Sequence, residues 1–177
     1  MAGDSIDALY SSDLERCLQT AAPLAARLGL DVVPLTELRE WDLGVLAGMT
    51  AEEAAVVEPD ALRIYRERIS DRVIPNGESI QQRFERVTSC LSRLARHHSG
   101  ERICVVTHGG PTGDCYRYAS SLGPGMRLSV DLCNAAINRI SIDGSQWKVL
   151  EWGRVDHLEQ IGTLKNWEGR NADSAPS

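Results

Sequence analysis

The stretch VVTHGGPTGD, residues Val105–Asp114, places a histidine between an apolar segment and a glycine-rich turn. The residues ICVV, Ile103–Val106, form a short apolar run that predicts a strand buried on both faces. Pro111 suits the first turn of a helix, because its missing N–H would have no partner there. Two glycines let the backbone approach a ligand closely, and the free N–H groups of a helix start favour an anion. The stretch therefore predicts a strand, an anion-binding turn at His108 and a helix.

Apolar spacing predicts the same alternation of strands and helices elsewhere in the chain. A capping box of Ser12 with Glu15 predicts a helix that ends at Gly29 and is bent or divided at Pro23. The other predicted elements are strands at 6–10 and 32–35, a helix from a Thr50–Glu53 capping box to Pro59, a helix from Pro59, a helix at 79–96, and a hairpin of 136–142 with 146–152.

This alternation predicts an α/β fold, specifically a three-layer α/β/α sandwich with a mostly parallel sheet. In such folds ligands bind beyond the carboxyl ends of the strands, which is where His108 is expected. The 177 residues, of which 42% are hydrophobic, are enough for one domain with its own core. We therefore expect a single domain over residues 1–162 and a loose C-terminal tail over residues 163–177.

Charge and composition argue against several classes of partner. The net charge of −6, without a basic block or stripe, argues against nucleic acid. No apolar run approaches membrane-spanning length and the first residues, MAGDSID, lack the features of a signal peptide, so a cytoplasmic protein is expected. The five cysteines stand singly, without a C-x-x-C pair, and are interpreted as reduced packing residues rather than as disulfide or metal ligands.

Three further stretches precede THGG in the chain. In order, they are YSSDLERCLQTA (Tyr10–Ala21), ELREWDLGVLAG (Glu37–Gly48) and PNGES (Pro75–Ser79). The first places Arg16 in the first turns of a helix at a strand end, where a guanidinium can bind a phosphate with two hydrogen bonds. Together the four stretches resemble the histidine phosphatase superfamily, the phosphoglycerate mutase-like group. The resemblance extends over most of the chain.

The resemblance implies a role for each matching residue. Arg16 matches the arginine that binds the transferred phosphoryl group, and His108 matches the second histidine of the family site, which binds the phosphoryl oxygens. Glu40 matches the proton donor to the leaving oxygen, whereas Glu37 falls outside the pattern. The N–H of Gly109 would add to the phosphate site. Such chemistry needs positive groups around the phosphoryl oxygens and an acid, so no metal and no cofactor are expected.

The resemblance also implies a strand that ends in R-H-G, whose histidine attacks phosphorus and whose arginine shares the phosphate pocket. No R-H-G occurs in this chain, whose histidines are His97, His98, His108 and His157. We interpret the His97–His98 pair as a solvated helix end and His157 as a structural or rim residue. An N-terminally truncated domain, without the family's first strand and helix and without the nucleophile, is therefore expected. A misassigned start codon is the favoured explanation, ahead of a truncation and a non-catalytic relative.

In the family this strand lies beside the one matched by Ile103–Val106. Its absence would leave backbone hydrogen-bonding groups of that strand unpaired. We expect the exposed edge to pair either with a neighbouring strand of the same sheet or with another chain, which makes a homodimer a candidate assembly.

The short segment between REWDLGVLAG and PNGES, together with THGG, resembles the small phosphatases of the superfamily. A phosphomonoester phosphatase that acts through a phosphohistidine in its complete form is therefore expected, the present chain being inactive or nearly so. The alternatives are a phosphoglycerate mutase and a non-catalytic module that binds a phosphorylated ligand. The expected ligand is a small phosphorylated metabolite, whose identity the motifs do not specify.

Overall fold

Three short parallel strands form the centre of the molecule, which we describe from a computed structural model over residues 5–161. Strand β1 (Ala8–Ser12) lies between β2 (Val32–Leu35) and β3 (Ile103–Val106). Both outer strands run in the direction of β1, so a parallel α/β fold is confirmed. The predicted tail over 163–177 lies outside the described residues.

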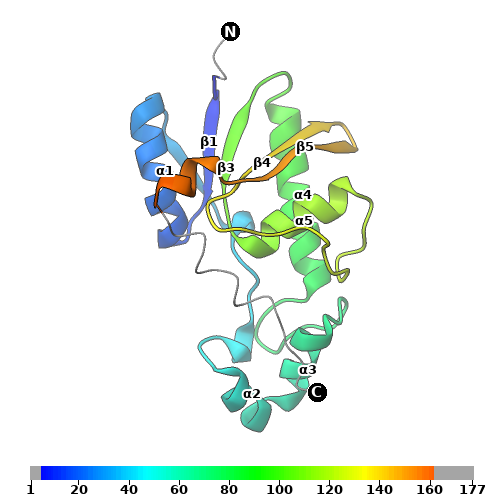
Figure 1. Cartoon of the computed structure of the whole chain (residues 1–177). Coiled ribbons are helices and arrows are strands. Elements are labelled where there is room, and N and C mark those ends of the chain that lie inside the picture. The colour runs from blue at the N-terminus through cyan, green and yellow to red at the C-terminus, as the bar shows by residue number, and fades with distance from the viewer. Residues whose placement is uncertain (1–4, 162–177) are drawn as a thin grey trace.

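Helices flank this sheet, with α1 (Glu15–Leu28) on one side and α4 (Ile80–His97) on the other (Figure 1). The face toward α4 contains Tyr10, Ile103 and Val105, which pack with residues of α4 and with a buried leucine at position 38. The buried apolar residues of these two helices are Cys17 and Ala21 of α1 and Ile80, Val87, Cys90 and Leu94 of α4.

Helix α1 departs from its prediction at its start and agrees with it at its end. Gly29 ends the helix in the left-handed conformation, with φ 66°, as expected for a glycine stop. The helix is continuous through Pro23, so the alternative of two helical pieces is wrong. The predicted Ser12–Glu15 capping box is also wrong, because the helix cap is Leu14 and makes no side-chain bond. Ser12 is instead buried at the end of β1.

Strand β3 has the predicted bounds but a different environment. All four of its residues are half-buried, so the expectation of burial on both faces is wrong. Among the described residues β3 pairs with β1 alone, and the next strands, β4 (Ile137–Asp143) and β5 (Gln146–Arg154), form a separate antiparallel hairpin. The expectation that a neighbouring strand of its own sheet closes this edge is therefore not met in the described chain. The hairpin packs on α4 and α5 (Gly109–Ala119) through the buried Trp147.

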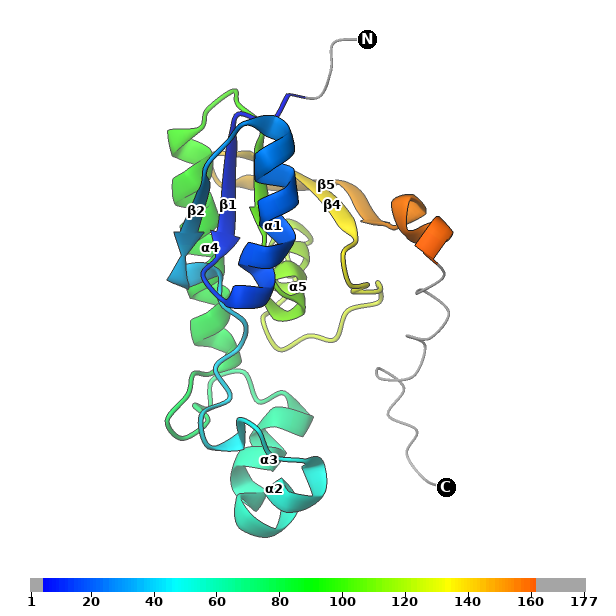
Figure 2. The same cartoon turned by 90° about the vertical axis from the view of Figure 1, so that its left-hand side faces the viewer.

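A smaller helical lobe follows β2, formed by α2 (Ala51–Val57) and α3 (Pro59–Glu67). The Thr50–Glu53 capping box and the helix start at Pro59 are confirmed. Figure 2 shows the arrowheads of β1 and β2 pointing toward this lobe, so the carboxyl end of the sheet faces it. None of the described helices is long and apolar enough to cross a membrane.

Two of the sequence stretches meet between the sheet and this lobe. The N–H of Val45 donates to the carbonyl of Pro75 at 2.9 Å. Gly44 has φ 49°, and a Cβ atom there would lie 2.1 Å from the same carbonyl oxygen. Only glycine combines this backbone conformation with so close an approach. The contact explains why a glycine is needed at this point in REWDLG and fixes the segment that carries Glu40 against PNGES.

The histidine pair at the end of α4 is not a solvated helix end as predicted. His98 is largely buried, with its Nε2 2.7 Å from the Tyr10 hydroxyl and its Nδ1 2.6 Å from Glu101 Oε2. His97 is exposed. The hydrogen bond from Tyr10 of β1 therefore holds His98 in a largely buried position. This contact joins residues far apart in the chain, so local spacing does not reveal it.

Candidate active site

Arg16 and His108 come together at the carboxyl end of the sheet. Arg16 lies in the first turn of α1, directly after β1, and His108 is the cap residue before α5, directly after β3. The Nε–H of Arg16 donates to His108 Nδ1 at 3.1 Å. Because β1 and β3 are parallel neighbours, the two helix starts lie at the same edge of the sheet. Residues 92 positions apart in the chain thus share one site.

The hydrogen bonds of His108 define its tautomer. A guanidinium only donates, so Nδ1 accepts from Arg16 and the ring proton is on Nε2. Nε2 donates that proton to Ser12 Oγ, 2.8 Å away. Ser12 thus accepts a hydrogen bond from His108 and does not act as the cap of α1. Burial lowers the pKa of His108, and the positive charge of Arg16 lowers it further. The ring is therefore a neutral donor, and a phosphoryl oxygen could take the place of Ser12 as acceptor.

Cys17 lies against the same ring, with its Sγ 3.4 Å from His108 Nε2. The thiol is buried, and burial raises its pKa. A thiol with a raised pKa carries little thiolate at neutral pH, so this cysteine is a packing residue here and a poor nucleophile. The five cysteines are all free, in agreement with the sequence interpretation of unpaired thiols.

Glu40 joins the site through two backbone N–H groups, one at the start of α5 and one on its own neighbour in the chain. Its carboxylate accepts from the N–H of Gly110 at 3.1 Å and from the N–H of Trp41 at 2.8 Å. The first of these donors belongs to the opening turn of α5, two positions beyond His108. A Cβ atom at Gly110 would lie 2.1 Å from Glu40 Oε1, so a glycine is needed for this approach. The structure thus brings together all three side chains that the sequence nominated.

Gly109, the predicted backbone contributor, is the first residue of α5. The His108 side chain makes no cap bond to this helix, so the helix start is left to other acceptors, of which the Glu40 carboxylate is one. A phosphate at the site would meet this positive helix end as well as Arg16.

Arg86 holds the segment that leads to Glu40. From α4 it donates to the carbonyl oxygens of Glu37 and Arg39, at 2.7 and 3.1 Å, and it pairs with the carboxylate of Glu78. The Glu37 side chain turns outward and pairs with Arg93 at the surface. This agrees with the view that Glu40 rather than Glu37 faces the site.

Sequence reasoning missed a buried ion pair beside Glu40. Arg83 of α4 donates through Nε and Nη2 to the two carboxylate oxygens of Asp114, at 2.7 and 3.1 Å. Arg117 donates to the same carboxylate at 3.1 Å. The Arg83 guanidinium also lies over the ring of Trp41, 5.1 Å from its centre. One signal was present in the sequence, because Arg83 lies on the face of α4 that Val87 and the other buried residues define.

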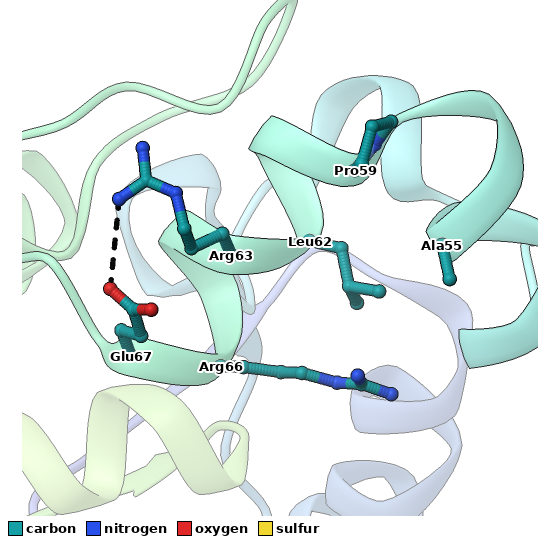
Figure 3. Close-up of a pocket in the computed structure, with 6 residues that line it drawn as sticks. All are labelled: Ala55, Pro59, Leu62, Arg63, Arg66 and Glu67. Atoms are coloured by element: carbon teal, nitrogen blue, oxygen red, sulfur yellow. Dashed lines mark ion pairs between the residues drawn. The ribbon is translucent and has the colours of Figure 1, made fainter.

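A surface pocket in the helical lobe is separate from this site. It is lined by Ala55, Pro59, Leu62, Arg63, Arg66 and Glu67 (Figure 3). Its charged residues include the Arg63–Glu67 pair, 3.7 Å apart on one helix. Since none of the nominated side chains lines it, we do not assign it to the same chemistry.

The fold and the site define a class of protein. It is an α/β protein that places an arginine, a histidine and a glutamate at the carboxyl end of a parallel sheet, beside a helix start suited to an anion. The chain belongs to branch 1 of the histidine phosphatase superfamily, whose sequence profile matches residues 1–155. The match begins at residue 1 and does not confirm the predicted truncation.

Two relatives from Arabidopsis thaliana illustrate the similarity in sequence. "Phosphoglycerate mutase-like protein 4" is 37% identical over 172 residues, which cover 96% of this chain and 74% of the relative. "Metal-independent phosphoserine phosphatase" is 34% identical over 174 residues, covering 96% of this chain and 69% of the relative.

Two solved structures illustrate the similarity in fold. Bacillus stearothermophilus YhfR has a TM-score of 0.80 at 22% identity, covering 89% of this chain and 78% of that protein. A mycobacterial glucosyl-3-phosphoglycerate phosphatase in complex with VO3 has a TM-score of 0.69 at 25% identity, covering 86% of this chain and 78% of that protein. The first likeness concerns the fold alone.

Proposed function

We propose that this chain is a phosphatase-type member of the superfamily that binds small phosphomonoesters at Arg16, His108 and Gly109. In this proposal catalysis goes through a phosphohistidine, with Glu40 as proton donor to the leaving oxygen. The observation that carries the proposal is the contact of Arg16 with His108 at 3.1 Å, with the carboxylate of Glu40 on the same helix start. These groups supply what phosphoryl binding needs, namely a guanidinium, a ring N–H and helix N–H groups.

The chain lacks R-H-G, and the residues that touch His108 include no activated nucleophile. We therefore propose that the 177-residue chain binds phosphomonoesters but hydrolyses them at or near the uncatalysed rate. A phosphoglycerate mutase is the second candidate, supported by the name of the 37% identical relative. The third candidate is a non-catalytic module, which would bind a phosphorylated ligand as the phosphatase does but would not hydrolyse it.

Binding is tested by titrating the protein with inorganic phosphate while the His108 ring signals are followed by NMR. We expect these signals to shift in wild type and the apparent affinity to fall about tenfold or more in Arg16→Ala, because charged hydrogen bonds are lost. Arg27→Ala is the matched control, since Arg27 is exposed in the last turn of the same helix. His108 signals that stay unmoved at high phosphate concentration would contradict the proposal.

Turnover is tested with 4-nitrophenyl phosphate and by a search for phosphohistidine in the ³¹P spectrum. Neither ordinary enzymatic turnover nor a phosphohistidine signal is expected from the chain. If either is found, the assignment of the nucleophile to the absent R-H-G motif is wrong.

A further inference from the structure

An ion pair at the surface joins the two segments that carry Arg16 and Glu40. The Nε–H of Arg39 donates to Asp13 Oδ1 at 2.7 Å, and its Nη2 donates to the second carboxylate oxygen of Asp13. Asp13 lies in the loop between β1 and α1, shortly before Arg16, and Arg39 directly precedes Glu40. The pair therefore connects two parts of the candidate site that are 26 positions apart in the chain.

Asp13 brings a negative charge to a site that is proposed to bind anions. Its chain neighbour Ser12 accepts the hydrogen bond of His108, and Arg16 follows in the first turn of α1. Burial and the charge of Arg16 lower the pKa of His108, whereas Asp13 is among the groups that raise it. The carboxylate is thus close enough to act on His108 electrostatically. A phosphate held by Arg16 and His108 would feel the same charge as a repulsion.

Arg39 keeps the Asp13 carboxylate ionised and at the same time offsets its charge. The hydrogen bond from Arg39 lowers the pKa of Asp13, and the same hydrogen bond raises the pKa of Arg39. Both groups are therefore charged at neutral pH. Together they present a dipole to the site, and the field of a dipole falls off faster with distance than that of a single charge.

We propose that Arg39 acts on the phosphate site through Asp13. It contacts no ligand itself, and it keeps the Asp13 carboxylate from repelling the anion that Arg16 and His108 bind. This inference rests on the proposed function, because it needs an anion at those two residues. It makes the Asp13–Arg39 pair a determinant of the affinity for phosphate, although neither side chain touches the phosphoryl group.

The opposing role for this pair is a mechanical brace between the two segments. If the pair were only a brace, removal of either partner would weaken phosphate binding, and removal of both would not restore it. Charge compensation predicts opposite signs, because Arg39→Gln leaves a lone negative charge beside the site and Asp13→Asn leaves a lone positive charge. The double variant carries the same summed charge there as wild type. The sign of each effect therefore distinguishes the two roles.

Calorimetric titration of the 177-residue chain with inorganic phosphate tests this, at low ionic strength and a mildly alkaline pH at which phosphate is a dianion. We expect binding to weaken about threefold to tenfold in Arg39→Gln and to strengthen at least about twofold in Asp13→Asn. The double variant should bind within about twofold of wild type. The side chains of Arg39 and Asp13 are 51% and 22% exposed, and exposed pairs stabilise a fold little, so all three variants should fold.

A matched ion pair supplies the control. Arg93 pairs with Glu37 at 2.8 Å and is 53% exposed, but the Glu37 side chain turns away from the site. Arg93→Gln removes the same charge as Arg39→Gln and should change phosphate affinity less than about twofold. Salt supplies a second readout, because the Debye length falls to about 3 Å at 1 M ionic strength. The differences among the Asp13 and Arg39 variants should shrink as salt is added, whereas the loss of a brace would persist.

The outcomes separate the two proposals. Weaker binding in both single variants at all salt concentrations would overturn charge compensation, and so would equal affinities in wild type and all three variants. In either case the proposed function stands as long as phosphate binding is lost in Arg16→Ala. If wild type binds no phosphate, or binds it independently of Arg16, the proposed function is wrong and the role of Arg39 falls with it.

Discussion

Two groups of basic residues meet at the start of α5, and they differ in how their charge is held. In one, the exposed Arg16 donates to a neutral histidine, so a ligand can replace the histidine as acceptor. In the other, Arg83 and Arg117 share the carboxylate of Asp114 with almost no exposure to water. The first group can exchange partners at little cost, whereas the second is part of the core. The same residue type therefore serves ligand exchange at one end of the site and structure at the other.

The largest expected effect concerns the buried group. Asp114→Asn keeps the shape of the side chain and removes the charge that two buried guanidiniums share. We expect the free energy of unfolding to fall by about 3–5 kcal/mol, because breaking a buried pair leaves uncompensated charge. Urea denaturation measures this. Asp60→Asn is the control, since its pair with Arg63 is exposed and long at 3.9 Å, and no measurable change is expected there. Equal stability of Asp114→Asn and wild type would show that the buried group is not a structural pair.

A smaller effect is expected at the point where the two groups meet. Gly110→Ala places a methyl group 2.1 Å from Glu40 Oε1 and 3.1 Å from Arg83 Nη1. We expect a loss of about 1–3 kcal/mol in the free energy of unfolding, because overpacking forces both side chains to move. In Gly109→Ala the nearest atom is 4.0 Å away, so that variant should be as stable as wild type or slightly more stable. Thermal or urea unfolding of the two variants side by side decides the matter, and equal losses would contradict the geometry.

The smallest effect is expected from acidification at the first group. Burial and Arg16 lower the pKa of His108, while Glu40 and Asp13 oppose the shift and Arg86 adds to it. The unfolded chain then takes up a proton at a higher pH than the folded chain, so stability should decline as the pH falls through and below the ordinary pKa of histidine. His108→Gln cannot take up this proton, so its stability should depend less on pH over the same range. Parallel curves for the two proteins would show that His108 titrates normally.

Local sequence information was sufficient for much of the fold. The bounds of β2 and β3, the Thr50–Glu53 cap and the stop at Gly29 all follow from neighbours within a few residues. Capping, helix termination and apolar periodicity are local effects, and nothing distant in this chain overrides them at these positions.

Three of the errors share one physical cause, which is a partner far away in the chain. Ser12 looks like a helix cap to its neighbours, but its hydroxyl bonds His108, 96 positions on. His98 looks like a solvated helix end, but its ring bonds Tyr10. The environment of β3 depends on which strands pair beside it, and the hairpin of β4 and β5 pairs with itself instead. Long-range pairing of this kind has no local signature.

The sequence by itself determined the family, the parallel α/β arrangement and the nomination of Arg16, Glu40 and His108, because ordered motifs and strand ends carry that information. Only the tertiary structure decided that Glu40 rests on the backbone of Gly110 and that Arg83 and Arg117 share Asp114. These contacts join side chains and backbone groups of three separate segments, and their energy depends on burial. Burial is a property of the folded packing rather than of any residue type. It therefore depends on how the helices pack against the sheet and against one another, which the sequence patterns do not specify.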